Sequence, residues 1–218
     1  MKKLFSALLF ASACFSGSSA SAQFLQDIHG KPVFETRYTH VEGSPYLHAD
    51  WTKGVVKLGN GQTFSDIDLK YDLVADELIF KNTDGSALNF VDPVSEFKLN
   101  GEPSMLFRNG FNAVDNHTSQ SFYQVLNDGG VKLLKKTSKK ITEIREYNSA
   151  SSTKRFDLIE TYYLARNNQP EKVRKDKKAI LKALKDRTDK LESYIRSEKL
   201  NLKEEGDLTT LIHYYNSL

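Results

Sequence analysis

Residues 66–72 read Asp-Ile-Asp-Leu-Lys-Tyr-Asp, and this stretch decides the fold class of the chain. Apolar side chains alternate with charged ones, which is typical of a strand with one buried face and one face in water. Short apolar, β-branched and aromatic runs recur from about residue 46 to residue 164. The pattern therefore predicts a protein built mainly of antiparallel strands.

Asn-Gly or Asp-Gly dipeptides separate these runs, beginning at positions 60, 84, 100, 109 and 128. Such pairs supply the positive φ angles of tight hairpins, so several should join antiparallel neighbours. The expected strands lie near residues 54–58, 67–71, 77–81, 96–99, 104–107, 121–126, 131–136, 141–147 and 156–165. They predict an antiparallel β-meander, closed as a sandwich or a partial barrel. An outer-membrane barrel is not expected, because charges lie on most of these strands.

The periodicity changes near Pro170, after which apolar residues recur three, four and seven positions apart. One apolar stripe predicts a helix of roughly 25 to 30 residues, with Asn168 as its cap and Pro170 in its first turn. A second helix is expected from about Lys203, forming an antiparallel αα-hairpin with the first. The expected fold class is therefore α+β, with a β-rich domain at residues 23–170 and a helical hairpin at 171–218 packed on the sheet.

Residues 1–22 have the features of an export signal. Two lysines precede an apolar run at residues 4–15, and residues 20–22 give the small-x-small pattern before a cleavage site. The run is too short for a membrane anchor, which needs roughly 20 apolar residues. Lipid attachment at Cys14 is less favoured, because the aliphatic residue expected three positions earlier is missing. The mature chain contains no further spanning segment and is expected in the periplasm or outside the cell.

Charge and cysteine content exclude several classes of protein. Without Lys2 and Lys3, 29 basic residues face 28 acidic ones, so no basic surface for nucleic acid is expected. Cys14 is the single cysteine, and its loss with the signal would leave no disulfide or thiolate metal site. The sequence lacks G-x-S-x-G and Gly-rich phosphate loops, so it points to no cofactor and favours a protein that is not an enzyme.

A short histidine cluster is the candidate metal site. His40, His48 and Asp50 flank a Gly-Ser-Pro turn, and a hairpin there could bring two imidazoles and a carboxylate to one divalent ion. A solvated hairpin is the favoured interpretation, because a metal site needs three or four convergent ligands. A metal-assisted hydrolase or a carbohydrate-binding protein using this region, with nearby aromatic rings as a platform, is the second functional hypothesis.

Carboxylates are frequent between residues 66 and 77, at Asp66, Asp68, Asp72, Asp76 and Glu77. Alternate positions on a strand lie roughly 7 Å apart, close enough for acid–base work or for calcium. No Gly-punctuated calcium loop accompanies them. The solvated face of a strand is therefore the favoured interpretation.

The helical hairpin carries the first functional hypothesis, a non-enzymatic binding or assembly protein of the cell envelope. Its apolar stripe is bordered by basic residues, which suits contact with another envelope protein or with an anionic envelope component. A solvated helix face explains the same charges. The residues expected to contact the partner are Lys178, Lys182, Lys185 and Lys190 by charge and Leu184 and Leu191 by burial.

Turn and core residues over most of the mature chain carry a resemblance. They are Gly43-Ser44-Pro45-Tyr46-Leu47, Trp51, Gly54, Val56, Asn60-Gly61, Leu69-Lys70-Tyr71-Asp72 and Leu211-Ile212-His213-Tyr214-Tyr215-Asn216. In these the chain resembles a group of exported bacterial proteins that has no assigned activity. The resemblance implies a shared fold and an envelope location, and it carries no catalytic residue.

Overall fold

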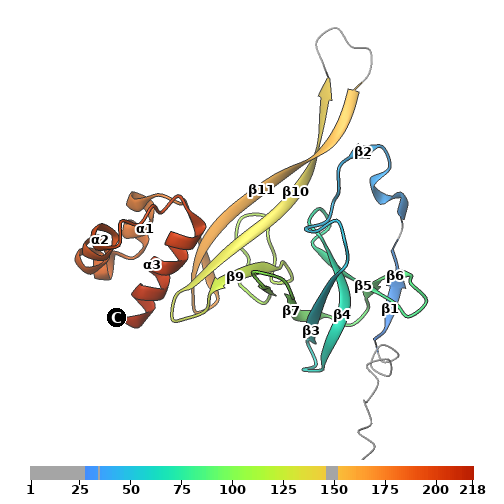
Figure 1. Cartoon of the computed structure of the whole chain (residues 1–218), viewed down its shortest axis with the longest axis horizontal. Helices are drawn as coiled ribbons and strands as arrows, with labels where there is room; N and C mark the ends of the chain where they lie inside the picture. Colours follow the sequence, from blue (N-terminus) through green and yellow to red (C-terminus); the bar gives the residue numbers. More distant parts are fainter. Residues whose placement is uncertain (1–27, 34, 146–151) are drawn as a thin grey trace, which may run out of the picture.

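The computed structural model describes residues 28–33, 35–145 and 152–218, so the expected signal lies outside the described residues. The strands are β1 (Gly30–Pro32), β2 (Val41–Glu42), β3 (Thr52–Leu58), β4 (Thr63–Asp72), β5 (Glu77–Lys81), β6 (Ala87–Phe90), β7 (Val94–Leu99), β8 (Met105–Arg108), β9 (Tyr123–Asn127), β10 (Lys132–Arg145), β11 (Ser152–Arg166) and β12 (Gln169–Val173). All twelve belong to one sheet (Figure 1).

The sheet is open and largely antiparallel. Its strand order is β1-β6-β5-β4-β3-β7-β8-β9-β10-β11-β12, and β2 pairs in parallel with β11. The predicted β-meander is thus confirmed for most of the chain, but the strands form one open sheet and not the predicted sandwich or partial barrel. The outermost strands cannot close the sheet, since β1 has three residues and β12 leads directly into the helices. The sheet nevertheless curls, as a main-chain hydrogen bond from Lys139 N of β10 to Leu73 O (2.9 Å) shows. Leu73 directly follows β4, and four strands separate β4 from β10 in the strand order.

Each of the five Asn-Gly or Asp-Gly dipeptides lies between two consecutive antiparallel strands, as predicted. A further turn escaped the sequence analysis: Asn167 and Asn168 have φ angles of 51° and 60° and connect β11 to β12. Asn168 therefore does not cap a helix, and Pro170 lies in β12 rather than in a first helical turn. The first helix begins at Lys177, where the Asp176 carboxylate accepts a hydrogen bond from Ala179 N (2.7 Å).

One long strand, β10, replaces two of the predicted strands and forms a two-stranded ribbon with β11. The sequence predicts separate strands at residues 131–136 and 141–147, but β10 continues through the residues between them. β10 pairs with β11 from Lys132↔Ala165 to Arg145↔Ser152, and this pairing overrides the local pattern. At about 3.3 Å per residue the ribbon is roughly 46 Å long. Its distal part projects beyond the rest of the sheet (Figure 1).

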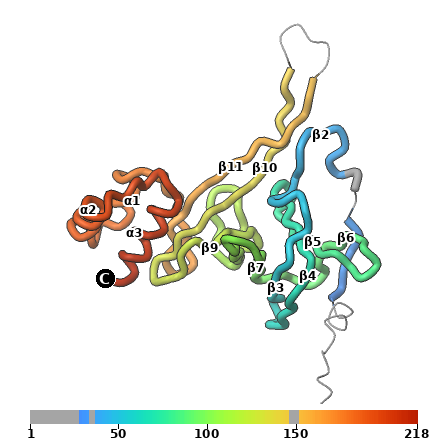
Figure 2. The backbone as a smooth tube through the Cα atoms, viewed as in Figure 1, coloured from blue at the N-terminus to red at the C-terminus, as the bar shows by residue number. Residues whose placement is uncertain are grey.

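Three helices follow the sheet: α1 (Lys177–Ala183), α2 (Thr188–Ser197) and α3 (Glu205–Ser217). They lie together against the β9–β12 end (Figure 2). The predicted first helix is interrupted at Leu184, whose φ and ψ of −111° and 37° end α1, so the helical hairpin is in fact a three-helix unit. Within the described ranges, no helix has the length and apolar character needed to cross a membrane.

Asn216, near the end of α3, joins this helix to the turn between β9 and β10. Its Oδ1 accepts from Val131 N (2.8 Å), and its Nδ2 donates to Val131 O and Asn127 Oδ1 (both 2.8 Å). Gly129 of the turn has no side chain where a Cβ would collide with this amide. The turn sequence and the C-terminal helix therefore fit each other at one specific point.

Two large apolar clusters and one small one form the core. The first fills the curl of β3–β8 and is rich in aromatic rings: Phe97 stacks on Phe107 and contacts Tyr71 and Phe122 edge-to-face. The second lies between the helices and the β9–β12 end of the sheet. The third, around Phe111, Tyr123 and Tyr163, lies on the opposite face of β10 and β11 from the second, because its residues alternate with those of the second cluster along both strands.

Leu184→Ala should lower the free energy of unfolding by about 3 kcal/mol, because Leu184 is completely buried in the second cluster and its loss leaves a cavity. Urea denaturation followed by circular dichroism measures the change. The matched control Lys182→Ala, at an exposed position of α1, should stay within about 0.5 kcal/mol of wild type. Equal effects of the two substitutions would contradict the burial of Leu184.

Candidate functional site

The structure does not bring the predicted metal ligands together. His40 lies beside β2, which pairs with β11, whereas residues 45–47 hydrogen-bond to the end of β4. The expected hairpin between residues 40–42 and 48–50 is therefore not formed, and His40, His48 and Asp50 are all exposed. Among the described residues no group of three or more His, Cys, Asp or Glu side chains could hold a metal ion.

The predicted partner-binding residues of the helical unit divide into two groups. Leu184 and Leu191 are fully buried in the cluster beneath the helices, so they are core residues and cannot contact a partner. Their apolar spacing is the one that any helix shows toward its own core. Lys178, Lys182, Lys185 and Lys190 lie on the exposed face, and their role in binding stays a prediction.

A buried ionic centre, formed by Tyr71, Asp76 and Lys136, joins the β4–β5 turn to β10. The Lys136 side chain is 3% exposed, and its Nζ lies 2.6 Å from Asp76 Oδ2. It also donates to Phe122 O (3.0 Å) and Tyr71 Oη (3.3 Å), so all three ammonium protons have acceptors. Tyr71 in turn donates its hydroxyl proton to Asp76 Oδ1. The centre is fully satisfied internally, which marks it as a support for its surroundings rather than as an acid–base site.

Burial perturbs both partners of Asp76. Desolvation lowers the pKa of Lys136 despite the opposing attraction of Asp76, and it raises the pKa of Tyr71 well above its ordinary value. Asp76 itself has a φ of 59°, a conformation that Asp and Asn tolerate better than most residues. The sequence pattern predicted a solvated strand face for Asp76 and gave no indication of this centre. Its lysine lies 60 positions further along the chain, and only the curl of the sheet brings it close.

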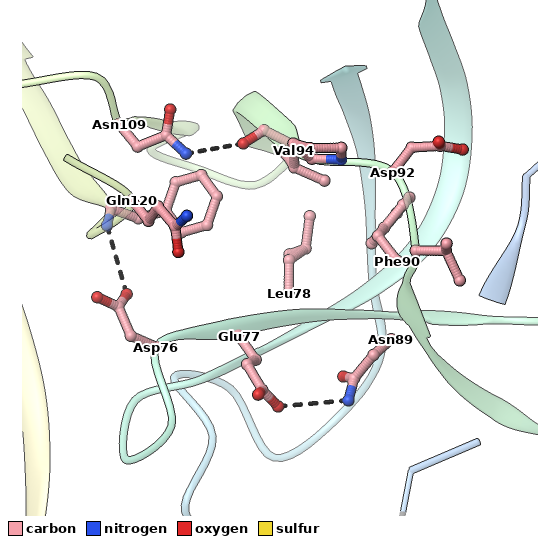
Figure 3. A pocket seen from close by; sticks show the side chains of 12 residues that line it. Asp76, Glu77, Leu78, Asn89, Phe90, Asp92, Val94, Asn109 and Gln120 are labelled. Atoms are coloured by element: carbon pink, nitrogen blue, oxygen red, sulfur yellow. Dashed lines mark hydrogen bonds between the residues drawn. The ribbon is translucent and has the colours of Figure 1, made fainter. Parts of the chain in front are cut away.

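Asp76 and Phe122 also line a pocket of about 320 Å³ (Figure 3). The pocket is bounded by the β4–β5 turn and β5, by the end of β6 and the β6–β7 connection, and by the β8–β9 loop at residues 109–122. Its lining residues are Asp76, Glu77, Leu78, Asn89, Phe90, Val91, Asp92, Pro93, Val94, Asn109, Gln120 and Phe122. No Lys, Arg or His is among them. The pocket combines an apolar base with a polar rim of carboxylates and amides.

Hydrogen bonds fix three of the polar residues at the pocket. Glu77 Oε2 accepts from Arg37 Nη1 (2.7 Å) and from Asn89 Nδ2 (3.3 Å). Asn109 Nδ2 donates to Val94 O (2.7 Å). Asn89 Oδ1 is shielded from solvent and has no hydrogen-bond partner among the described residues. Because side chains alternate along β5 and β6, Glu77 and Asn89 lie on the sheet face opposite Leu78 and Phe90, so this acceptor does not face the apolar lining (Figure 3).

The outer edge of β11 is the second candidate site. β2 pairs with it at Lys154 and Arg155, and β12 pairs with it from Tyr162 onward. No strand and no other backbone group of the described chain pairs with residues 157–161 on this side, here called the β11 gap. An unpaired strand edge is a template for another extended chain.

The register shows which main-chain groups face this gap. Lys139 N–H points away from β11, toward Leu73 O, so Lys139 and its partner Leu158 form a non-hydrogen-bonded pair. The N–H and C=O of Leu158, and by alternation those of Glu160, therefore point outward into the gap. Within the gap, β11 therefore presents unpaired main-chain N–H and C=O groups at every second residue, as the edge strand of a sheet does.

Exposed apolar side chains accompany this edge. Leu158 is 57% exposed and Ile159 is 39% exposed, and they lie on opposite faces of the ribbon. Single apolar side chains are common on protein surfaces, so the unpaired main-chain edge, rather than these side chains, marks the β11 gap as a candidate site.

No protein-family model, curated protein or solved structure matches this chain, so its functional assignment rests on the geometry of these two sites.

Proposed function

We propose that this is an exported, non-enzymatic binding module of the cell envelope that takes up an extended segment of a partner protein at the β11 gap. The observation that carries the proposal is the interrupted edge of β11, unpaired at residues 157–161 between β2 and β12. Strand addition to such an edge is a common mode of peptide recognition, in which main-chain hydrogen bonds give affinity and alternate side chains give specificity.

The chain itself supports this use of the edge. β2 is a segment of two residues that already lies on the same edge as a parallel strand. Extended backbone is thus accommodated beside β11 without a rearrangement of the ribbon. A partner segment would continue this arrangement along the gap, covering Leu158 on one face and Ile159 on the other.

Charge around the gap selects an acidic segment. Asp157 pairs with Arg155 (2.9 Å), and Lys135 pairs with both Glu160 and Glu205 (2.8 Å each). Three further lysines lie near the gap and form no salt bridge among the described residues: Lys140, which attracts Asp157 at longer range, Lys175, which lies over the Tyr162 ring and attracts Glu205, and Lys154. The excess of basic over acidic side chains around the gap favours an acidic partner and speeds its association.

A labelled peptide of about eight residues with alternating Glu and Val, long enough to span the gap at about 3.3 Å per residue, tests the proposal. Fluorescence anisotropy should show saturable binding that weakens with salt. Hydrogen exchange should show that the peptide protects the amides of Leu158 and Glu160. Leu158→Pro should weaken binding at least about tenfold, since it removes a donor that faces the gap while proline is tolerated at such an edge position.

Leu158→Thr, which keeps the N–H, is the matched control and should retain most of the affinity. A peptide with Lys in place of Glu should bind much more weakly. The proposal is wrong if the Glu–Val peptide leaves both amides unprotected, or if the Lys–Val peptide binds equally well. Because the exchange measurement uses the wild-type protein, it remains decisive even where the proline variant fails to fold.

A further inference from the structure

We infer that the three-helix unit binds the surface of a membrane rich in anionic phospholipids. The binding residues are Lys178, Lys182, Lys185 and Lys190, here called the lysine cluster. They belong to α1, to α2 and to the single turn between these helices. The helices and the distal part of the ribbon lie in different parts of the molecule (Figure 1), so this surface is separate from the β11 gap.

Positive charge is concentrated in this part of the chain. Residues 172–190 contain nine Lys or Arg and three Asp, which gives them a net charge of +6. The whole chain has a net charge of +3, so all its other residues together carry −3. A helix face that is merely solvated normally mixes both signs. Solvation alone therefore does not explain this excess of one sign.

The lysine cluster is not compensated by the protein itself. Lys177 pairs with Glu192 at 3.7 Å, and Arg187 pairs with Asp186 at 3.8 Å. None of the four lysines of the cluster forms a salt bridge or a side-chain hydrogen bond with another described residue. Their charges are thus available to an external anion.

The four lysines are also neighbours of one another. Lys178 and Lys182 are four positions apart on α1, and Lys185 follows three positions later. Lys185 and Lys190 line the same surface pocket. Like charges at this spacing destabilise a helix. An anionic surface would relieve the repulsion, so the arrangement is favourable only beside such a surface.

The composition of the exposed surface favours lipid over a folded protein as the partner. From residue 174 to residue 190 every exposed side chain is charged, and the apolar side chains are buried or half-buried. Protein interfaces depend on aromatic and apolar residues at their centre and contain few lysines there. Phospholipid head groups require no matching apolar surface, because charge alone attracts a basic segment to them.

The attachment should be purely electrostatic. Both α1 and α2 are fully described, and neither exposes a large apolar side chain. Nothing on them would insert into the hydrocarbon region, as the apolar face of an interfacial helix does. Binding should therefore be lost at about 1 M salt, where the screening length is about 3 Å.

Co-sedimentation of the whole mature protein with vesicles tests the inference. The protein should bind vesicles made of phosphatidylglycerol and phosphatidylcholine in equal parts, and it should not bind vesicles of phosphatidylcholine alone. Lys178→Gln combined with Lys182→Gln should weaken the binding about 25-fold, because each lysine near an anionic surface contributes about fivefold. Circular dichroism checks that this variant is folded.

Lys57→Gln combined with Lys98→Gln is the matched control. Both lysines are exposed, on the paired strands β3 and β7, and neither forms a salt bridge with a described residue. This variant loses the same charge and should bind as wild type does. The inference is wrong if anionic vesicles stay unbound, if neutral vesicles bind equally well, or if the two double variants lose affinity equally.

Poly-glutamate represents an acidic protein partner. If it binds with the same dependence on Lys178 and Lys182 while the vesicles stay unbound, the lysine cluster belongs to a protein interface and the inference is wrong. Leu158→Pro, which should weaken peptide binding at the β11 gap, should leave vesicle binding unchanged. The two proposals are thereby tested separately.

Discussion

Asp76→Asn should lower the free energy of unfolding by about 3–5 kcal/mol, the cost of leaving a buried charge without its partner. Lys136 is 3% exposed and depends on Asp76 for its only ion pair among the described contacts. Asparagine has nearly the same shape and tolerates the positive φ of this position, but its amide cannot neutralise an ammonium group. Thermal and urea denaturation measure the loss.

Asp66→Asn is a closely matched control, because Asp66 in β4 has a φ of 60°, nearly the same as the 59° of Asp76. Its carboxylate is 62% exposed and 3.7 Å from Lys53, so its substitution should cost less than about 1 kcal/mol. The double variant Asp76→Asn with Lys136→Met should recover much of the stability, since neither charge is then left buried. If Asp66→Asn and Asp76→Asn destabilise equally, the ionic centre is not a buried pair.

The pH dependence of the Asp76→Asn variant has a definite sign. Burial already lowers the Lys136 pKa, and Asp76 opposes that shift, so its removal should lower the pKa further. A lysine with a folded pKa below its unfolded value, near 10.4, binds fewer protons in the folded state within that interval. The stability of the variant should therefore rise with pH up to about 10.4.

Wild-type protein should unfold cooperatively as the pH rises above about 10, the ordinary pKa of tyrosine. Burial is the main cause that raises the pKa of Tyr71, Tyr123, Tyr162 and Tyr163, to about 12 in the case of Tyr123. Each raised pKa contributes stability that is complete below pH 10 and is lost as pH rises toward the folded value. The loss is up to about 1.4 kcal/mol per tyrosine and pH unit, or about 5.5 kcal/mol per pH unit for the four together.

Tyrosinate absorbance and circular dichroism, recorded together against pH, should show both signals changing in one transition. Tyr123→Phe should move that transition to higher pH, because the Tyr123 hydroxyl is buried without a hydrogen-bond partner and its removal costs no bond. Gradual titration near pH 10 with an unchanged circular dichroism spectrum would show instead that these hydroxyl groups are accessible in the folded state.

Local pattern was sufficient to predict most strands and their turns. β4 follows its alternation, with Ile67, Leu69 and Tyr71 buried, and β5 spans the predicted residues. Asp72 is an exception, since the alternation placed it in water and the structure buries it at 1% exposure. There it accepts from Tyr38 Oη and from two main-chain N–H groups of the following turn. A polar side chain can be buried where the chain itself supplies its hydrogen-bond partners.

Features that depend on distant parts of the chain escaped prediction. The continuous β10 results from its pairing with β11, and the break at Leu184 allows α1 and α2 to share one apolar cluster. The pocket is lined by residues from positions 76 to 122. The β11 gap is defined by strands β2 and β12, and neither strand has a clear periodicity in the sequence. Sequence indicated binding over catalysis, but the surfaces that could bind arise only when the sheet curls.

The bond between Asn216 and the β9–β10 turn has a consequence for the biosynthesis of the protein. Asn216 lies 85 residues after Val131 in the sequence, and it completes the hydrogen bonding of Val131 at the base of the ribbon. Synthesis proceeds from the N-terminus, and earlier segments generally fold first. The β9–β10 turn can therefore reach its final state only after the segment up to Asn216 has been synthesised, well after the strands on either side of the turn.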